Sequence, residues 1–381
     1  MSDARRIDLL LRQGWTLVEA GQPVEALARF TEAVATGGGR VDLLLEKGVA
    51  EFKLGLHDEA LVTFRQVIAR DRTQAVAHHN AAKVLLLLGR PEEALAAYDE
   101  VLQLQPDSYR TLVLKGTLLG ELGRCEEALD TLDQATQLRP REVEAFLAAG
   151  RTLRHVGHTE QALQTLLWCQ GLTPLDPAVC HELGLCLEAA GYPEEAIDAL
   201  ANAVRGRPEQ IDYLVELARA LNANRHPLDA IDCCTRALAL DATRAAALRE
   251  LGRGELLLGE APGRGHLHQG QALRLEGAEE EALAELEAAL ACDRTLDEAW
   301  AERGRALLAL GRLEEAVESF YCSLQERPGA VAVQLELADL LWQRLGRREE
   351  ATGLYRRAVQ IEVKRWFELP PEVRAAVDQP R

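Results

Sequence analysis

Aromatic residues are scarce in this sequence. Only 4% of its 381 residues are Phe, Trp or Tyr, although 48% are hydrophobic. A core of this composition must consist largely of Leu, Ala and Val, and the high content of Leu and Ala favours helix. Long apolar runs are also lacking, and no stretch reaches the roughly 18 consecutive apolar residues that a membrane span needs. We therefore expect no membrane association.

The lack of a signal peptide and of net positive charge bears on the cellular location and on the kinds of partner to expect. Asp8, Arg12 and Gln13 interrupt the N-terminal apolar stretch too early for a signal peptide, so a cytoplasmic location is expected. Lys and Arg number 43 against 61 Asp and Glu, which gives a net charge of −18. This charge argues against broad affinity for nucleic acid or anionic lipid, although a local basic face can exist within an acidic chain.

The sequence also lacks paired metal-binding cysteines. None of the eight cysteines forms a CxxC pair, and a cytosolic chain keeps its thiols reduced, so we expect them to pack as small apolar groups. Neighbouring histidines such as His78 and His79 are expected on helix faces rather than as ligands. We predict no metal site and no cofactor.

The sequence contains internal repeats. Self-similarity at a fixed period is the sequence signature of repeat architectures. Similar segments are GRPEEALAAYDEVLQLQP (89–106), GRCEEALDTLDQATQLRP (123–140), GYPEEAIDALANAVRGRP (191–208) and GRLEEAVESFYCSLQERP (311–328). The first two are 34 residues apart. A frame of that length, counted from Ile7, begins at residues 7, 41, 75, 109, 143, 177, 211 and 245, and then at 263, 297 and 331.

Small residues recur at fixed positions of this frame. The eighth position is always Gly or Ala: Gly14, Gly48, Ala82, Gly116, Gly150, Gly184, Ala218, Gly252, Gly270, Gly304 and Ala338. The twentieth is Ala from Ala26 to Ala316, and Ala351 is displaced by one residue. Positions four, eight and eleven form one stripe of a first helix, and positions 20, 24 and 27 form one of a second helix. Each repeat thus predicts a closely packed hairpin whose remaining apolar surface is buried by its neighbours.

This pattern resembles the tetratricopeptide repeat family over about residues 7 to 365. The resemblance implies an all-α fold: a right-handed α-solenoid superhelix of about ten 34-residue repeats, one of them incomplete. It also implies that the first helices line a concave groove and that the protein binds other proteins. Co-chaperone members that clamp a C-terminal carboxylate carry Lys and Asn where this sequence has Leu11, Arg12 and Trp15, so chaperone tails are not expected as ligands.

The stripe that meets ligands in this family, at positions two, five, nine and twelve, is mainly basic here. Its basic residues are His79, Lys83, Arg110, Arg151, Arg154, His181, Arg219, Arg249, Arg253 and Arg305. We hypothesise that they bind an extended or helical protein segment with carboxylates, through forked hydrogen bonds from the arginines. The alternative is that these arginines pair with neighbouring glutamates and hold the hairpins together.

No segment outside the repeats is long enough for a catalytic domain, so no catalytic residue is proposed and no enzyme is expected. The leading interpretation is a scaffold or adaptor that gathers proteins. Two alternatives remain, a regulatory subunit that controls one enzyme partner and, less favoured, a protein that binds single-stranded RNA. Self-association is left open. The segment 366–381 is expected to cap the array, with Trp366 and Phe367 in the cap and a short helix from Pro371 to about Asp378. The alternative for the two aromatic residues is that they anchor a partner protein.

One stretch, EAPGRGHLHQGQ (260–271), breaks the pattern. It follows a first helix at 245–260, and the next first helix starts 18 residues later instead of 34, so a second helix is missing. We expect a module of seven hairpins plus this lone helix (1–260), a glycine-rich joint (261–265) and a module of three hairpins (266–365). The alternative is that a helix at 266–276 takes the vacant second-helix place and inverts the faces of all later helices.

Overall fold

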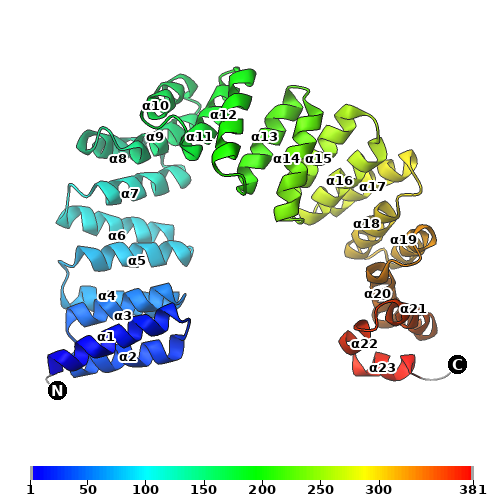
Figure 1. Ribbon diagram of the computed structural model, residues 1–381, viewed down its shortest axis with the longest axis horizontal. Coiled ribbons are helices and arrows are strands. Elements are labelled where there is room, and N and C mark those ends of the chain that lie inside the picture. Colours follow the sequence, from blue (N-terminus) through cyan, green and yellow to red (C-terminus); the bar gives the residue numbers. More distant parts are fainter. Residues whose placement is uncertain (1–2, 379–381) are drawn as a thin grey trace. The chain divides into compact units, whose positions relative to one another are not determined.

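The computed structural model describes residues 3–378, which form 23 α-helices and one π-helix, without any strand. The helices pack as consecutive antiparallel pairs, which confirms the predicted all-α solenoid (Figure 1). Two compact units can be distinguished, unit 1 with residues 1–174 and unit 2 with residues 175–381. Each unit is described by itself.

Unit 1 contains five stacked hairpins. Its helices are α1 (Asp3–Glu19), α2 (Pro23–Thr36), α3 (Val41–Lys53), α4 (His57–Arg70), α5 (Ala75–Leu87), α6 (Pro91–Leu104), α7 (Tyr109–Glu121), α8 (Cys125–Leu138), α9 (Val143–His155) and α10 (Thr159–Leu172). The first helices α3, α5, α7 and α9 begin at the residues that the 34-residue frame predicts.

Unit 2 contains five hairpins, a lone helix and a short C-terminal segment. Its helices are α11 (Pro177–Ala189), α12 (Pro193–Gly206), α13 (Ile211–Ala223), α14 (Pro227–Leu240), α15 (Ala245–Leu258), α16 (Pro262–Leu275), α17 (Glu279–Cys292), α18 (Asp297–Ala309), α19 (Leu313–Glu326), α20 (Val331–Asp339), the π-helix η1 (Leu340–Arg344), α21 (Arg348–Ile361), α22 (Arg365–Glu368) and α23 (Pro371–Val377).

The small residues of the frame explain why the helices pair. A Cβ atom added to Gly48 would lie 2.7 Å from the ring of Phe64, and one added to Gly116 would lie 2.6 Å from Leu132. The residue at position eight therefore receives the large side chain at position 24 of the second helix. The alanines at position 20, such as Ala60, are fully buried. A larger side chain at either position would force the helices apart.

The turn inside each hairpin also recurs. Gly55 and Gly89 end their first helices with φ angles of 77° and 69°, in the left-handed region that favours glycine. In the hairpin of α13 and α14 the same place is taken by Arg225, whose φ is 63°. Among the described residues it is the one non-glycine with positive φ.

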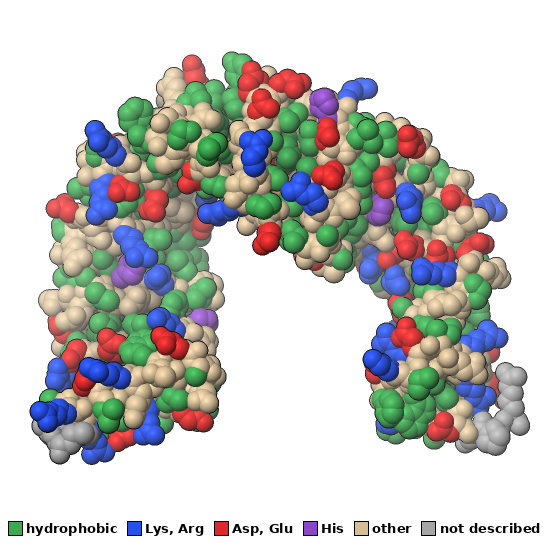
Figure 2. Space-filling model, viewed as in Figure 1, with side chains coloured by type: hydrophobic (Ala, Val, Ile, Leu, Met, Phe, Trp, Pro, Cys, Tyr) green, Lys and Arg blue, Asp and Glu red, His purple; other side chains and the backbone are tan. Residues whose placement is uncertain are grey.

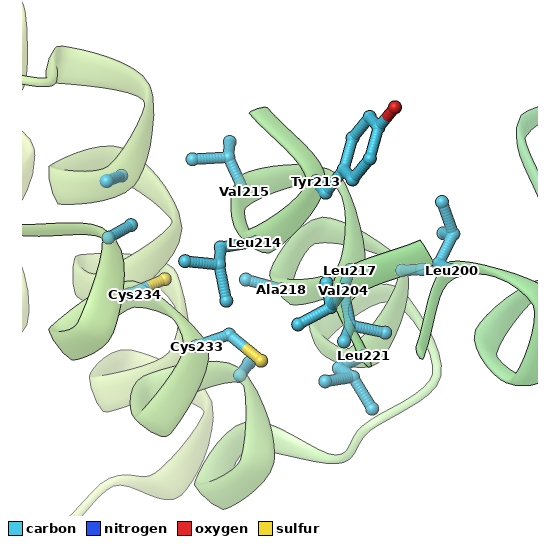
Figure 3. Close-up of a cluster of buried hydrophobic side chains, with 14 of the residues drawn as sticks. Leu200, Val204, Tyr213, Leu214, Val215, Leu217, Ala218, Leu221, Cys233 and Cys234 are labelled. Atoms are coloured by element: carbon cyan, nitrogen blue, oxygen red, sulfur yellow. The ribbon is translucent and has the colours of Figure 1, made fainter. Parts of the chain in front are cut away.

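The cysteines largely pack as the sequence predicts. Cys233 and Cys234 of α14 lie against Leu214 and Ala218 of α13 in the core of unit 2 (Figure 3). Burial raises the pKa of these two thiols to about 11 and about 12, so both are protonated at neutral pH. The buried cysteines are Cys169, Cys180, Cys186, Cys233 and Cys234. The prediction was wrong for Cys292, which is exposed.

The irregular stretch differs from its expected form. The glycine-rich joint predicted at 261–265 was wrong in its extent, because α16 begins at Pro262 and includes Gly263 and Gly265. Helix α15 ends at Leu258, so only three residues connect the two helices. A Cβ atom added to Gly252 would lie 2.5 Å from the carbonyl oxygen of Gly265. These glycines therefore allow close packing of α15 on α16.

The later hairpins keep their usual register. Gly270 of α16 faces Leu286 of α17, and a Cβ atom on Gly270 would lie 2.7 Å from that side chain, as in a normal hairpin. Helix α16 is thus a first helix that packs directly on the lone first helix α15. Helix α16 also packs on α15 as a second helix packs on a first, since Gly252 of α15 lies against Gly265 and Gln269 of α16. The predicted boundary near residue 261 lies inside unit 2, and the two units divide instead at Pro174 and Leu175.

The last repeat contains one extra residue. Ala351 is displaced by one position in the sequence, and the structure absorbs the insertion in the π-helix η1, just before the turn at Gly346. A π-helix accommodates one additional residue per turn without interrupting the helix. The position-20 packing is kept, since Ala351 is fully buried.

The C-terminal segment packs on the last hairpin. Leu369 and Val373 are buried in the cluster that contains Tyr355, and α23 begins at the predicted Pro371. Trp366 is half-buried beside Arg374, whose guanidinium lies 5.1 Å from its ring. The expectation for Phe367 was wrong, because its side chain is 73% exposed. Residues 379–381 of the predicted cap lie outside the described residues.

The contact of α15 with α16 gives a testable prediction. Replacement Gly252→Ala should lower the free energy of unfolding by about 1–3 kcal/mol, because its Cβ would meet backbone atoms that cannot move aside. Replacement Gly353→Ala, in a helix with no atom within 4 Å of the new Cβ, should raise it by about 0.5–1 kcal/mol. Urea denaturation measures both, and changes of the same sign would contradict this packing.

Candidate protein-interaction surface

The predicted binding stripe of unit 2 contains a regular set of ion pairs. Arg219 of α13 donates from Nη1 and Nη2 to the two carboxylate oxygens of Glu188 on α11, both at 2.6 Å. Its Nε donates to Glu216 at 2.8 Å. Burial alone would lower the pKa of Arg219, but the hydrogen bonds to both glutamates raise it above its ordinary value. Arg219 thus links two neighbouring first helices.

Arg305 repeats this arrangement further along unit 2. Its Nε and Nη2 donate to Glu336 of α20 at 2.8 and 2.9 Å, and its Nη1 donates to Glu302 at 2.7 Å. Glu302 also accepts a hydrogen bond of 2.6 Å from Nε of Arg274 on α16. Three successive first helices are therefore joined by charge-assisted hydrogen bonds.

The remaining arginines of this stripe are also paired. Arg249 donates to Glu276, and Arg253 lies 4.0 Å from Glu250. Nδ2 of Asn222 donates to the same Glu250 at 2.9 Å. The alternative interpretation, internal pairing, therefore describes the structure for Arg219, Arg249, Arg253 and Arg305.

Four of the glutamates that form these pairs share one position of the frame. They are the position-six residues Glu216, Glu250, Glu302 and Glu336. The sequence prediction did not consider position six. The signal was available, because Glu recurs there at a spacing of 34 residues in unit 2.

Three further predicted residues, His181, Arg154 and Arg151, also make interactions within the protein. His181 stacks on Tyr213 with ring centroids 4.5 Å apart, and its Nδ1 lies 4.0 Å from Glu182. Nη2 of Arg154 lies 3.4 Å from Nε2 of His155 on α9. Arg151 and Arg154 both make interactions within the protein.

The other three residues form a different arrangement in unit 1, which we call the basic cluster: His79 and Lys83 of α5 and Arg110 of α7. His79 and Lys83 are four residues apart and share one face of α5. Arg110 is exposed, and His79 and Lys83 are half-buried. Within residues 3–378, neither Lys83 nor Arg110 has a carboxylate oxygen within 4.0 Å. Their charges are therefore not neutralised by the fold.

The electrostatics of His79 show that these cations act together. Burial lowers the pKa of His79, and the positive charges of Lys83 and Arg110 lower it further. His79 is consequently neutral at pH 7, and the cluster carries its charge on Lys83 and Arg110. On the face drawn in Figure 2, basic and acidic side chains are interspersed without a continuous band of either sign.

Two kinds of feature are not found among the described residues, a cluster of metal-binding side chains and a membrane-spanning helix. No group of three or more His, Cys, Asp or Glu side chains in that part of the chain is placed to hold a metal ion. None of its helices is both long and apolar enough to cross a membrane. His266 and His268 instead face different helices, with Nδ1 of each within 2.7 and 2.6 Å of Glu285 and Glu255 respectively.

Comparison with known families agrees with the hairpin geometry. Tetratricopeptide repeat models match residues 73–141 and, in a second model, residues 11–75, 113–177 and 302–362. The chain belongs to the tetratricopeptide repeat family. Its repeats are thus of a type that serves as a protein-interaction scaffold.

Solved structures share the fold. A tetratricopeptide repeat protein from Parabacteroides merdae is 17% identical, with a TM-score of 0.56, 66% of this chain covered and 99% of that chain. A human IFIT1 dimer with PPP-AAAA is 17% identical, with a TM-score of 0.55 and 84% of each chain covered. A search of curated proteins found no match. At this identity the likeness concerns the fold alone.

The paired and unpaired arginines of the repeats predict different effects on stability. Arg219→Ala should lower the free energy of unfolding by about 1 kcal/mol, because it removes three hydrogen bonds between partly exposed charges. Arg110→Ala should change it by less than about 0.5 kcal/mol. Urea denaturation of both variants tests this contrast. Equal losses would show that Arg110 is also held by the fold.

The lowered pKa of His79 predicts a pH effect. Because the folded-state pKa lies below the ordinary 6.5, the unfolded chain binds more protons, so this part of the stability is lost as pH falls from 6.5 through the folded pKa. NMR titration of the His79 ring should give a midpoint below 6.5, and Lys83→Met should move it upward. A wild-type midpoint at or above the ordinary value would refute the lowered pKa.

Proposed function

We propose that this protein is a non-enzymatic scaffold that binds an acidic segment of a partner protein at the basic cluster of α5 and α7. The observation that supports this assignment is the contrast between the two sets of cations. Lys83 and Arg110 have no carboxylate partner among the described residues, whereas Arg219 and Arg305 each bind two glutamates. A carboxylate of a partner protein binds most favourably to a cation that has no carboxylate partner within the protein.

An acidic ligand on the unit 2 stripe would have to compete with the glutamates that already hold the arginines. Breaking such a pair leaves a partly buried charge without its partner, which opposes binding. The glutamates themselves also repel a second carboxylate. The predicted basic groove is accordingly reduced in this proposal to the three residues of the basic cluster.

Two other functions make different predictions. A regulatory subunit would retain one enzyme partner at fixed stoichiometry, whereas a scaffold would retain several partners that share an acidic segment.

Binding of single-stranded RNA has in its favour the likeness to IFIT1, which was solved with PPP-AAAA. The low aromatic content and the net charge of −18 oppose it, because single-strand binding depends on stacking and on phosphate neutralisation. We also propose a cytoplasmic location, as the sequence predicts.

Affinity capture with mass spectrometry tests the proposed surface. The double variant Lys83→Ala/Arg110→Ala should lose most of the partners captured by the wild-type chain, and those partners should elute at moderate salt. The matched control Arg72→Ala/Arg141→Ala removes the same charge from exposed positions of unit 1 and should retain them. An unchanged set of partners in the first variant would contradict the proposal.

A further inference from the structure

Two buried tyrosine hydroxyls in unit 1, those of Tyr98 and Tyr109, have no hydrogen-bond partner among the described residues, and the ring of Tyr98 lies next to His79 of the basic cluster. Tyr98 of α6 is fully buried, and its hydroxyl oxygen contacts no donor or acceptor in the structure. Leaving a buried polar group unpaired is unfavourable, so such groups are rare and often mark functional sites. The packing does not require it, since the same frame position is occupied by apolar side chains elsewhere: Phe30, Phe64, Leu132, Leu166, Leu200, Leu286 and Phe320.

The last hairpin shows what such a hydroxyl can bind. Tyr355, which occupies the equivalent position after the one-residue insertion, donates its hydroxyl hydrogen to the carboxylate of Asp339 on the first helix. Asp339 is at position nine of its repeat. The residue at position nine in the hairpin of Tyr98 is Lys83. The two hairpins therefore share the tyrosine, but the hairpin of Tyr98 has a cation where the last hairpin has a carboxylate.

The groups around Tyr98 belong to the basic cluster. Its ring lies 6.0 Å from the ring of His79, measured between centroids, and the two planes are tilted by 57°. Burial raises the pKa of Tyr98, and the charge of Arg110 acts on it in the opposite direction. The ring of Tyr98 thus packs beside His79, the charge of Arg110 acts on its hydroxyl, and Lys83 occupies the frame position that Asp339 has in the last hairpin.

We propose that Tyr98, Lys83 and Arg110 form a subsite for one carboxylate group of the bound partner. The partner's Asp or Glu side chain takes the place that Asp339 holds in the last hairpin: it accepts the hydroxyl hydrogen of Tyr98 and pairs with the two cations. This assignment rests on the proposed function and adds a specific residue and a specific chemical group to it.

The last hairpin of the same chain indicates why a carboxylate should fit this subsite better than another anion. The pair of Tyr355 and Asp339 shows that this hairpin geometry places a tyrosine hydroxyl opposite a carboxylate. Because the hydroxyl of Tyr98 is buried in the ligand-free protein, the proposal requires that the half-buried side chain of His79 or Lys83 rotate when the ligand enters. Because the His79 ring is neutral, it does not repel Lys83 and Arg110, and both cations can pair with the carboxylate of the ligand.

The test measures affinity and stability on the same variants. The probe is a capped peptide of alternating Glu and Ala residues, and a Gln–Ala peptide, inorganic phosphate and random single-stranded RNA are the comparison ligands. Tyr98→Phe should weaken binding of the Glu–Ala peptide about tenfold, as expected for one hydrogen bond to a charged group, without lowering Tm. Calorimetric titration and thermal unfolding of the full chain give both values.

Tyr355→Phe is the matched control. It should lower Tm, because it removes a hydrogen bond that exists in the protein, and it should leave the affinity for the peptide unchanged. The wild-type chain should bind the Glu–Ala peptide and should not bind its Gln–Ala counterpart.

Three outcomes would overturn this inference. Unchanged binding in Tyr98→Phe, together with weaker binding in Lys83→Ala/Arg110→Ala, would remove the subsite and leave the proposed function intact. Tighter binding of phosphate or RNA than of the peptide would assign the cluster to another ligand. Absence of peptide binding to the wild-type chain would also refute the subsite, and the capture experiment would then decide the proposed function separately.

Discussion

The close approach of two helices at one small residue is the contact on which this structure depends. In each regular hairpin the side chain at position 24 fills the space that Gly or Ala leaves at position eight, as Phe64 does over Gly48. Aromatic or leucine side chains at that place supply the burial that stabilises a hairpin. Because the contact is repeated, neighbouring hairpins present equivalent faces, and the charged residues of successive first helices come into register.

The same constraint explains the irregular stretch. When the second helix is missing after α15, the next first helix packs directly on it, and Gly252 and Gly265 allow their backbones to meet. The glycines that look like a flexible joint in the sequence are thus the condition for close packing. The charged pairs continue beyond this point, since Arg274 of α16 binds Glu302 of α18.

Helix positions could be predicted from the sequence because glycine and alanine recur where the backbones of two helices approach closely. The pairing of charges could not be predicted in the same way, since it depends on which rotamers reach across helices. Arg305 and Arg110 are alike in the sequence as basic residues of one stripe. The structure separates them, because Arg305 has glutamates at position six on both helices within reach and Arg110 has none. Phe367 was mispredicted because burial at a chain end follows no periodic pattern.

The account's central claim is that the cations of the predicted stripe that the fold leaves unpaired, Lys83 and Arg110, and not those paired within it, form the binding surface. Amide hydrogen exchange of the full chain, with and without a saturating captured partner, tests this claim most directly. The account predicts that protection increases on α5 and α7, around Lys83 and Arg110. Protection confined to α13, α18 and α20, with no change on α5 and α7, would contradict it.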